Sequence, residues 1–450
     1  MALNMRDIIA DKRYSKELTD EQIEFFVNGV TDGSIPDYQI SALLMAIVLN
    51  GMTDRETTTL TLKMASSGEQ NDLSYLGSKA VDKHSTGGVG DKCTPILLAL
   101  VGSFGINCVK LSGRGLGFTG GTVDKFESIV GFNPIIEYED FEEMVKRNGV
   151  IISGQSPNLA PADKVLYALR DVTSTIDSIP LIASSIMSKK IAGGAQAIVL
   201  DVTCGQGAFM KTIEQARELS KAMIEIGKLS GRQVVCVITS MEEPLGHSIG
   251  NTLEMMEVYE TLTGKGSEDL LTVVTTLAAY MIDLSESDKV NEFFGHKPTI
   301  DELITECRQR LNNNMALNAY ANLILGQGGN IDSNLSPVYV DYPAEAIRLT
   351  ASSTGYISAI KADVIGNASV ELGAGRLTKE SQLDYGAGIT LYKKIGDFVK
   401  KGDVVCVLYK GSNATIDEDK LWNATELAAD AFEYSEVEVP KHPVILDVLT

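Results

Sequence analysis

Along the first 65 residues, apolar and polar positions alternate with the period of a helix, and almost no strand pattern occurs. Thr19 with Gln22 has the spacing of a capping box, and Thr53 with Glu56 repeats it. Asp37 is the predicted cap of a helix between these two. One face of the first predicted helix carries Ile23, Phe26, Val27 and Val30. The segment is therefore predicted to be a small helical unit.

From residue 80 onward, short apolar runs alternate with glycine-rich turns and longer helical stretches. The runs 106–112, 197–202 and 234–240 are typical of buried strands, whereas 212–229 has a helical period. Buried strands that alternate with helices form a largely parallel sheet covered on both faces. This part of the chain is predicted to be an α/β lobe.

A further helical stretch, 161–191, lies between the predicted strands near residues 110 and 200. It follows a glycine- and proline-rich stretch and ends before Gly193 and Gly194. Such flanks allow the stretch to return to the N-terminal helices. Hinges between the lobes are predicted at 66–80, 153–161 and 192–196.

After residue 345, short strands are broken by turns at Gly396-Asp397 and Gly402-Asp403, which is typical of a small antiparallel β unit. The unit resembles a biotinyl/lipoyl-type barrel-sandwich but lacks the modifiable lysine hairpin, so no prosthetic group is expected. The predicted fold class is α/β, with a small all-helical lobe, a large α/β lobe with a mixed sheet, and this C-terminal α+β unit. The predicted ranges are 1–65 plus 162–192 for the helical lobe, 80–153 plus 196–344 for the α/β lobe, and 345–450 for the C-terminal unit.

Composition restricts the function. Hydrophobic residues make up 44% and charged residues 22% of the chain, as in ordinary globular proteins. The 60 acidic and 39 basic residues give a formal net charge of −21, which disfavours binding to nucleic acid or to an anionic membrane. No apolar run is long enough to span a bilayer, and the charged N-terminus does not resemble a secretory signal, so a cytoplasmic location is expected. The 6 cysteines and 4 histidines lack metal-ligand spacing, and no metal is predicted.

Two glycine-rich loops carry most of the candidate chemistry: KHSTGGVGDK at 83–92 and KLSGRGLGFTGGT at 110–122. Each follows an apolar run and precedes a helix, so its backbone N–H groups can approach an anion. Lysines and hydroxyl residues surround these N–H groups. Together the loops predict a pocket for phosphate.

The common nucleotide-binding motifs fit the two loops less well. Residues 115–120 match the dinucleotide fingerprint, with Glu137 or Glu139 as the acidic residue that follows, but this leaves the first loop unexplained. A P-loop requires Ser or Thr after its lysine, whereas Cys93 follows Lys92. Tight turns between strand and helix are the remaining alternative.

The longer motifs resemble the thymidine and pyrimidine-nucleoside phosphorylase family. The similarity includes SGRGLGFTGGTVDKFESIVGF at 112–132, LYALRDVTSTIDSIPLIASSIMSKKIAGG at 166–194, AIVLDVTCGQGAFMKT at 197–212 and PLGHSIGNTLE at 244–254. It extends over nearly the whole chain. The resemblance implies a homodimeric pentosyltransferase in which phosphate attacks a pyrimidine nucleoside and releases the free base and a pentose 1-phosphate, reversibly and without a cofactor.

The resemblance also implies residue roles. The phosphate ligands would be Lys83, Ser85, Thr94, Lys110, Ser112 and Thr122. The pyrimidine ligands would be His84, Arg170, Ser185 and Lys189, of which His84, Arg170 and Lys189 would be catalytic. Arg170 and Lys189 would stabilise negative charge on the departing base. The spacing of Ser185 and Lys189 places them on one helix face.

The chain departs from the family pattern near the loops. Phe118 stands where the family usually has His, Thr203 where it tends to have Lys, and Gln206 where it tends to have Ser. Losses of this kind keep a non-catalytic nucleoside- or phosphate-binding relative open as an alternative.

A further departure is Lys92. In broad-specificity members, residues matching Gly90, Leu245, Ser248 and Glu257 would surround a monovalent cation, and a hydroxyl residue would stand at the position of Lys92. We expect the Lys92 ammonium to replace the cation and to pair with Glu257. An exposed lysine is the alternative.

Lys110 bears on specificity, because strict thymidine phosphorylases usually have Met there and broad-specificity members have Lys. A cationic donor could bond a ribose 2′-hydroxyl, so activity on uridine is expected as well as on thymidine and deoxyuridine. A strict thymidine phosphorylase remains an alternative. Another is a phosphoribosyltransferase of related fold, such as the anthranilate type, which would need Mg²⁺ and an acidic pair near the loops.

Overall fold

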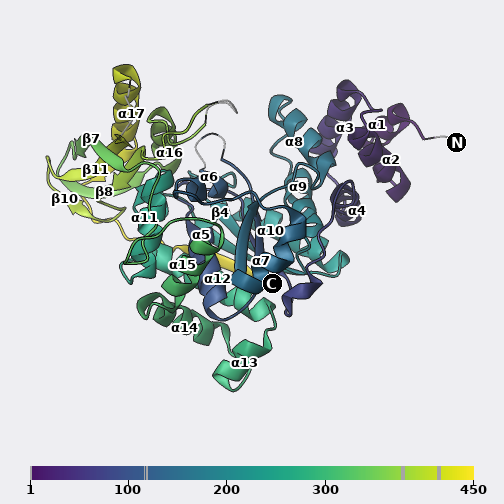
Figure 1. Cartoon of the computed structure of the whole chain (residues 1–450). Helices are drawn as coiled ribbons and strands as arrows, with labels where there is room; N and C mark the ends of the chain where they lie inside the picture. Colours follow the sequence, from purple (N-terminus) through teal and green to yellow (C-terminus); the bar gives the residue numbers. More distant parts are fainter. Residues whose placement is uncertain (1–2, 116, 118–119, 377–380, 413–416) are drawn as a thin grey trace.

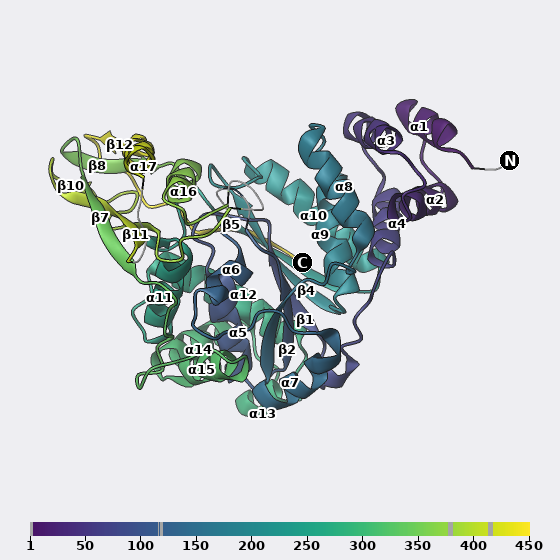
Figure 2. The same cartoon turned by 45° about the horizontal axis from the view of Figure 1, so that its top comes forward.

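The computed structural model describes residues 3–115, 117, 120–376, 381–412 and 417–450, which form three units (Figure 1). A helical unit lies at one side, a β-rich C-terminal unit at the other, and an α/β lobe between them (Figures 1 and 2). This arrangement confirms the predicted fold class.

The helical unit contains α1 (Met5–Arg13), α2 (Asp20–Thr31), α3 (Asp37–Asn50), α4 (Asp54–Ala65), α8 (Pro161–Val172) and α9 (Ile179–Ala192). The predicted capping boxes of α2 and α4 are both present. The prediction that Asp37 caps α3 is wrong, because Asp37 is already the first helical residue and the N-cap is Pro36. Proline has no side-chain acceptor, so this helix begins without a side-chain cap.

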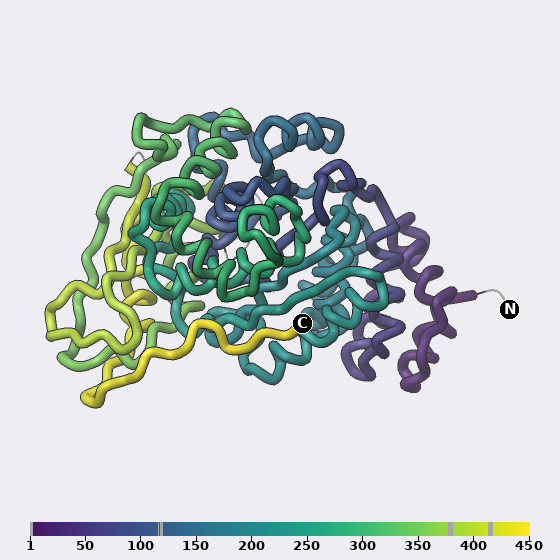
Figure 3. Tube along the Cα trace, turned by 90° about the horizontal axis from the view of Figure 1, so that it is seen from below, coloured from purple at the N-terminus to yellow at the C-terminus, as the bar shows by residue number. Residues whose placement is uncertain are grey.

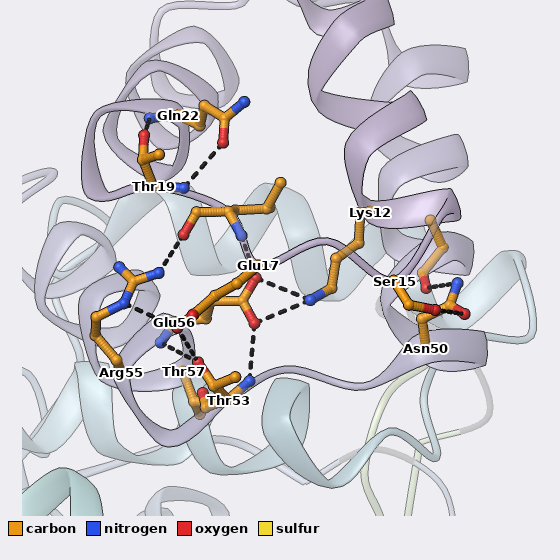
Figure 4. A network of polar contacts seen from close by, with 12 residues as sticks. Lys12, Ser15, Glu17, Thr19, Gln22, Asn50, Thr53, Arg55, Glu56 and Thr57 are labelled. Carbon is orange, nitrogen blue, oxygen red and sulfur yellow. Dashed lines mark hydrogen bonds and ion pairs between the residues drawn. The ribbon is translucent and has the colours of Figure 1, made fainter.

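A buried ion pair joins α1 to α4. Lys12 Nζ lies 2.8 Å from Glu56 Oε1, and the two side chains are 4% and 1% exposed. The same carboxylate accepts the backbone N–H groups of Leu18 at 2.7 Å and of Thr53 at 2.8 Å (Figure 4). Each oxygen of Glu56 is therefore satisfied, which offsets the cost of burying its charge.

The later helices α8 and α9 belong to two cores. Ala162, Leu166 and Leu181 share a hydrophobic core with α1–α4. Ile186 and Ile191, farther along α9, pack instead into the core that includes one face of the central sheet. Helix α9 thus connects the helical unit to the α/β lobe.

The α/β lobe is built on a four-stranded sheet in the order β1 (Val81–Ser85), β4 (Ala197–Cys204), β5 (Gln233–Ser240) and β13 (Ile445–Leu449). The first three strands are parallel, and β13 is antiparallel to β5. Along β4, Val199 belongs to the core of one face and Ile198 and Leu200 to that of the other. Both faces are buried, as expected for strands without polar alternation.

A parallel pair, β2 (Cys108–Ser112) and β3 (Val150–Gly154), lies beside β1. The other elements of the lobe are η1 (Ser74–Leu76), α5 (Cys93–Ser103), α6 (Thr122–Glu127), η2 (Tyr138–Asp140), α7 (Phe141–Asn148), α10 (Ile213–Leu229), α11 (Asn251–Leu262), α12 (Glu268–Leu284), α13 (Asp288–Phe294), α14 (Ile300–Asn312) and α15 (Met315–Gly326). Within the described residues, no single helix has the length and apolar content to cross a membrane. Helices α12 and α13 meet that test only as a pair bent by 111°.

The C-terminal unit contains two small antiparallel sheets and two helices. One sheet has the order β6 (Ser248–Ile249), β9 (Gly388–Leu391), β11 (Val404–Gly411) and β7 (Pro343–Thr350), and its strand β6 comes from the α/β lobe. The other sheet has the order β10 (Phe398–Val399), β8 (Gly355–Ile360) and β12 (Phe432–Ser435). The helices are α16 (Ala362–Glu371) and α17 (Glu418–Asp430). The predicted range 345–450 needs correction at its end, because β13 leaves this unit and covers the edge of β5 (Figure 3).

The connecting peptides between the helical unit and the α/β lobe lie together. Glu69 N donates to Asn158 O at 3.0 Å, and Asn71 N donates to Ala192 O at 2.8 Å. A Cβ at Gly68 would lie 2.0 Å from Asn158 O, so only glycine allows this approach. The three segments predicted as hinges therefore meet in one junction.

Candidate active site

The two glycine-rich loops lie at the carboxyl ends of β1 and β2, where each leads into a helix. Both strands belong to parallel pairs, and ligand sites in α/β proteins lie beyond the carboxyl ends of such strands. In the first loop, φ is 101° at Gly87 and 74° at Gly90. In the second loop, a Cβ at Gly121 would lie 1.9 Å from Gly115 N. The backbone paths that bring the loops to the site therefore require glycine.

Lys83 is the most deeply buried of the predicted phosphate ligands, at 1% exposure. Its Nζ lies 3.2 Å from Asp201 Oδ2 and 3.6 Å from Asp91 Oδ2, without good hydrogen-bond geometry. Burial alone would lower the pKa of Lys83, but the two carboxylates outweigh it and raise that pKa. The residue is therefore a fixed positive charge whose N–H groups can bind an anion.

Asp91 shapes the first loop. Its Oδ1 accepts Cys93 N at 3.2 Å, and the neighbouring Ser85 Oγ accepts Gly87 N at 3.2 Å. Ligand atoms of Asp91, Cys93 and Asp201 lie within 4.8 Å of one another. This cluster does not favour a metal ion, because burial raises the pKa of the Cys93 thiol well above its usual value and Lys83 already lies beside both carboxylates.

The side-chain nitrogen of Lys110 contacts other groups of the protein. Its Nζ lies 3.2 Å from Asp82 Oδ1 and donates to Leu111 O at 2.9 Å. Lys190 Nζ lies 2.7 Å from the other oxygen of Asp82, so two ammonium groups share one carboxylate. Burial, together with repulsion from Lys190, outweighs the attraction of Asp82 and lowers the pKa of Lys110 to about 7.

The hydroxyl residues of the predicted phosphate set lie at the ends of elements beside the loops. Ser85 and Ser112 are the last residues of β1 and β2. Thr94 lies in the first turn of α5, and Thr122 is the first residue of α6. The structure thus brings the predicted phosphate set to one edge of the lobe, where the positive end of the α5 dipole adds to the charge of the lysines.

His84, one of the predicted pyrimidine ligands, lies in β1 directly after Lys83. Burial lowers its pKa well below the usual value, and the charges of Lys190, Lys110, Lys189 and Lys83 lower it further. The imidazole is therefore neutral near pH 7 and can donate one hydrogen bond and accept another.

On the helical side, Lys189 is held by two neighbours. Its Nζ donates to Ser185 Oγ at 3.0 Å and lies 2.6 Å from Asp163 Oδ2. The shared helix face predicted for Ser185 and Lys189 is thereby confirmed. Asp163 lies in the first turn of α8 and is 4% exposed, so it fixes the ammonium from within the protein.

Arg170 lies near the end of α8 and is 3% exposed. Its guanidinium donates to Thr175 O at 3.2 Å, to Ile176 O at 2.7 Å and to Leu181 O at 3.0 Å. Among the described residues, no hydrogen bond or ion pair joins it to the predicted phosphate set. These bonds use three of its five N–H donors, so the group is held firmly and retains donors for a ligand.

The acidic partners of these cations were missed by the sequence analysis. Asp201 lies within the apolar strand β4, and a buried carboxylate requires a cationic partner. A carboxylate within an apolar run was therefore the signal in the sequence that could have revealed Asp201. Asp82 lies in β1, whose sequence VDKHS is mostly polar and gave no such indication. Asp163 had no such signal, because its partner Lys189 comes from another helix.

Among the departures from the family pattern near the loops, the structure explains Thr203. Thr203 Oγ1 donates to Gly87 O at 2.5 Å, and Thr203 N donates to Thr86 Oγ1 at 2.9 Å, so this residue braces the first glycine loop against β4. Gln206 is exposed, and nothing in the structure explains it. Phe118 lies outside the described residues.

Lys92 forms a buried ion pair with Glu257 at 3.0 Å, and its Nζ also donates to Leu245 O at 2.7 Å. Glu257 accepts the backbone N–H groups of His247 at 2.8 Å and Ser248 at 2.7 Å. Burial would lower the pKa of Lys92, but the negative charge of Glu257 outweighs it and raises that pKa. The alternative of an exposed lysine is wrong.

Comparison with known proteins assigns the family. Residues 6–68 match the helical bundle domain and residues 77–296 the α/β domain of a glycosyl transferase family, and residues 356–430 match the pyrimidine nucleoside phosphorylase C-terminal domain. The pyrimidine-nucleoside phosphorylase of Bacillus subtilis (strain 168) is 49% identical over 95% of this chain and 97% of its own length. That of Geobacillus stearothermophilus is 45% identical over the same shares.

Among solved structures, anthranilate phosphoribosyltransferase from Thermus thermophilus matches with a TM-score of 0.54, over 71% of this chain and 98% of that one. At 15% identity, this likeness concerns the fold alone. The sequence matches are far stronger and extend through all three units. The chain therefore belongs to the pyrimidine-nucleoside phosphorylase family, a group of pentosyltransferases.

Proposed function

We propose that this protein catalyses the reversible phosphorolysis of pyrimidine nucleosides, namely uridine, thymidine and deoxyuridine, to the free base and ribose or deoxyribose 1-phosphate. The observation that carries the proposal is the electrostatic environment of His84. Lys83 and Lys110 from the phosphate loops and Lys189 from the helical side all act on its pKa. Cations expected to bind phosphate and a cation expected to bind the pyrimidine therefore act electrostatically on the same side chain.

In this reaction a phosphate oxygen attacks C1′ of the nucleoside, the bond from C1′ to the base breaks, and its electron pair leaves with the base. Lys83 and Ser112 orient the phosphate, and orientation of two reactants supplies roughly 7–11 kcal/mol of the barrier. Arg170 and Lys189 place positive charge where the base becomes negative. Neutral His84 donates a hydrogen bond to a base carbonyl.

The test is phosphorolysis of uridine, thymidine and cytidine followed side by side by ultraviolet absorbance, with phosphate and with arsenate. Release of uracil and thymine supports the proposal. A non-catalytic binding protein would leave uridine unchanged. A phosphoribosyltransferase would need a diphosphate donor and Mg²⁺ before any product appeared.

Activity on ribonucleosides is proposed because of Lys110. Its ammonium lies on the phosphate side, held between Asp82 and Leu111 O, and Lys190 stands on the other oxygen of Asp82. A donor in this position can bond a 2′-hydroxyl, whereas an apolar side chain would leave that hydroxyl unpaired. A strict thymidine phosphorylase would cleave uridine poorly.

The Lys92 ammonium is proposed to act in place of a monovalent cation. Its contacts, a backbone carbonyl and a carboxylate, are the hard oxygen ligands that alkali and alkaline-earth cations prefer. A Cβ at Gly246 would lie 2.8 Å from Nζ, and one at Gly90 would lie 3.4 Å from it, so the backbone encloses the ammonium closely. On this basis the enzyme needs neither potassium nor another cofactor.

A homodimer is proposed on the basis of exposed apolar side chains on three helices of the helical unit. Helix α3 packs against both α1 and α8. The exposed residues are Tyr38, Met45, Val48 and Leu49 on α3, Val165, Tyr167 and Val172 on α8, and Tyr14 at the end of α1. A second copy of the chain would cover the same surface on both partners. In light scattering we expect a dimer, and a monomer for Leu49→Lys with Val172→Lys; a wild-type monomer would refute the proposal.

A cytoplasmic location is proposed because all six cysteines are unpaired and buried. Reduced cysteines are usual in reducing compartments, whereas secreted proteins tend to pair them. Cell fractionation with an antibody against the chain tests the location, and recovery outside the cytoplasm would contradict it.

A further inference from the structure

The C-terminal unit contacts the second glycine-rich loop through Arg376, at the part of the loop between Ser112 and Thr122, of which residues 113–115, 117, 120 and 121 are described. Arg376 Nη1 donates to Asp124 Oδ1 at 2.8 Å, and the two side chains are 14% and 3% exposed. The carbonyl oxygen of Arg376 accepts Gly117 N at 3.0 Å. One residue of the C-terminal unit thus contacts the loop with its side chain and with its main chain.

Asp124 carries this contact into the loop. Its Oδ2 accepts Gly115 N at 2.7 Å, and its Oδ1 also receives Arg114 Nη1 at 3.1 Å. A Cβ at Gly121 would lie 2.5 Å from Asp124 Oδ2, so the loop closes tightly around the carboxylate. Gly115 and Gly121 are therefore held against a buried negative charge that Arg376 helps to balance.

The segment that carries Arg376 is itself anchored to the start of α11. Asn251 Nδ2 donates to Ala374 O at 2.9 Å, and Thr252 N donates to Tyr385 O at 3.0 Å. Gly375 lies against the loop, since a Cβ there would be 3.0 Å from Gly117 O. Arg376 is thus presented to the loop from a fixed position.

We propose that Arg376 is a positioning residue for the phosphate site, so that the C-terminal unit supports phosphate binding without touching the phosphate. Ser112 and Thr122, the phosphate ligands expected here, stand at the two ends of this loop, and a shift of the loop moves both. Without Arg376, the one cationic partner that Asp124 keeps among the described residues is Arg114, whose side chain is 47% exposed. The inference rests on the proposed function.

The test compares two variants that lose the same charge from the same unit. Arg376→Ala is expected to raise the Kd for inorganic phosphate and the KM for phosphate by about tenfold or more, because it removes a charge-assisted hydrogen bond from a buried carboxylate. The KM for uridine at saturating phosphate should change less than about twofold, since the base side keeps its contacts. Arg348→Ala is the matched control, because Arg348 pairs with Glu345 on the surface, with exposures of 62% and 44%.

Three further measurements separate positioning from a general loss of structure. Arg376→Lys should regain part of the phosphate affinity, and added guanidinium should restore Arg376→Ala but leave Arg348→Ala unchanged. Asp124→Asn keeps an acceptor for Gly115 N and removes the charge, so its effect and that of Arg376→Ala should be far from additive.

The outcomes distinguish failure of the role given to Arg376 from failure of the proposed function. Phosphate affinity in Arg376→Ala equal to that in Arg348→Ala, or additive effects in the double variant, would overturn the inference and leave the proposed function standing. A wild-type protein that binds phosphate but leaves uridine intact would overturn the proposed function instead. If Arg376→Ala does not fold, Arg376→Lys and Asp124→Asn answer the same question by the same phosphate titration.

Discussion

Lys92 Nζ and Glu257 Oε2 lie 3.0 Å apart in the interior, and together they tie the first glycine-rich loop to α11. The Lys92 ammonium also donates to Leu245 O, at 2.7 Å. On the neighbouring residue, Gly246 O accepts Lys394 Nζ from the C-terminal unit at 2.9 Å. Two ammonium groups, one from the loop and one from the C-terminal unit, therefore bind successive carbonyls of the segment that leads into α11.

The first prediction concerns potassium. Wild-type activity should be equal with KCl and with tetramethylammonium chloride at the same ionic strength, even with crown ether present. Lys92→Thr leaves Glu257 buried without its cation, so this variant should lose activity and regain it as KCl is added. Lys420→Thr, a change at an exposed lysine of α17, is the control. Potassium dependence of the wild-type enzyme would refute the role given to Lys92.

The second prediction concerns specificity. Lys110→Met should reduce kcat/KM for uridine more than for thymidine, by about tenfold in the ratio, because the 2′-hydroxyl loses its donor. Phosphorolysis of both nucleosides under identical conditions measures the ratio. Equal losses on the two substrates would show that Lys110 serves phosphate alone.

The third prediction concerns the partner of Lys189. Asp163 lies 2.6 Å from the ammonium, and its charge also acts on Arg170. Asp163→Asn should lower kcat by roughly tenfold to a hundredfold, because Lys189 and Arg170 then lose the negative charge that helps to position them. The KM for phosphate should stay the same, and Asp301→Asn, at an exposed position of α14, should have no effect. A rise in the phosphate KM instead would contradict this assignment.

The fourth prediction concerns pH. The pKa of His84 is lowered in the folded protein by burial and by the surrounding lysines, whereas the unfolded chain has a pKa of about 6.5. Below about pH 6.5, the unfolded chain takes up a proton that the folded chain refuses, so stability falls as the pH decreases. Urea unfolding at several pH values should show a smaller fall for His84→Gln. Equal slopes for the two proteins would mean that His84 is protonated in the folded state.

Local signals in the sequence were sufficient for most elements. The capping boxes of α2 and α4 and the strands at Cys108–Ser112, Ala197–Cys204 and Gln233–Ser240 depend on neighbouring residues and on apolar periodicity, and they were predicted. Asp37 was misassigned because a single Asp fits both the cap and the first turn. The last strand, β13, was assigned to the wrong unit because its pairing with β5 joins residues far apart in the chain.

The sequence by itself determined the three units, the two glycine-rich loops and the residues that carry charge to them, because periodicity, turn chemistry and long motifs are written in consecutive positions. The pairing of Lys92 with Glu257 was also expected from the sequence. Only the tertiary structure decided which carboxylate balances each of the other lysines of the site: Asp201 for Lys83, Asp82 for Lys110 and Asp163 for Lys189. The physical reason is that a buried charge must find its partner in space, and the packing of whole elements brings these partners together.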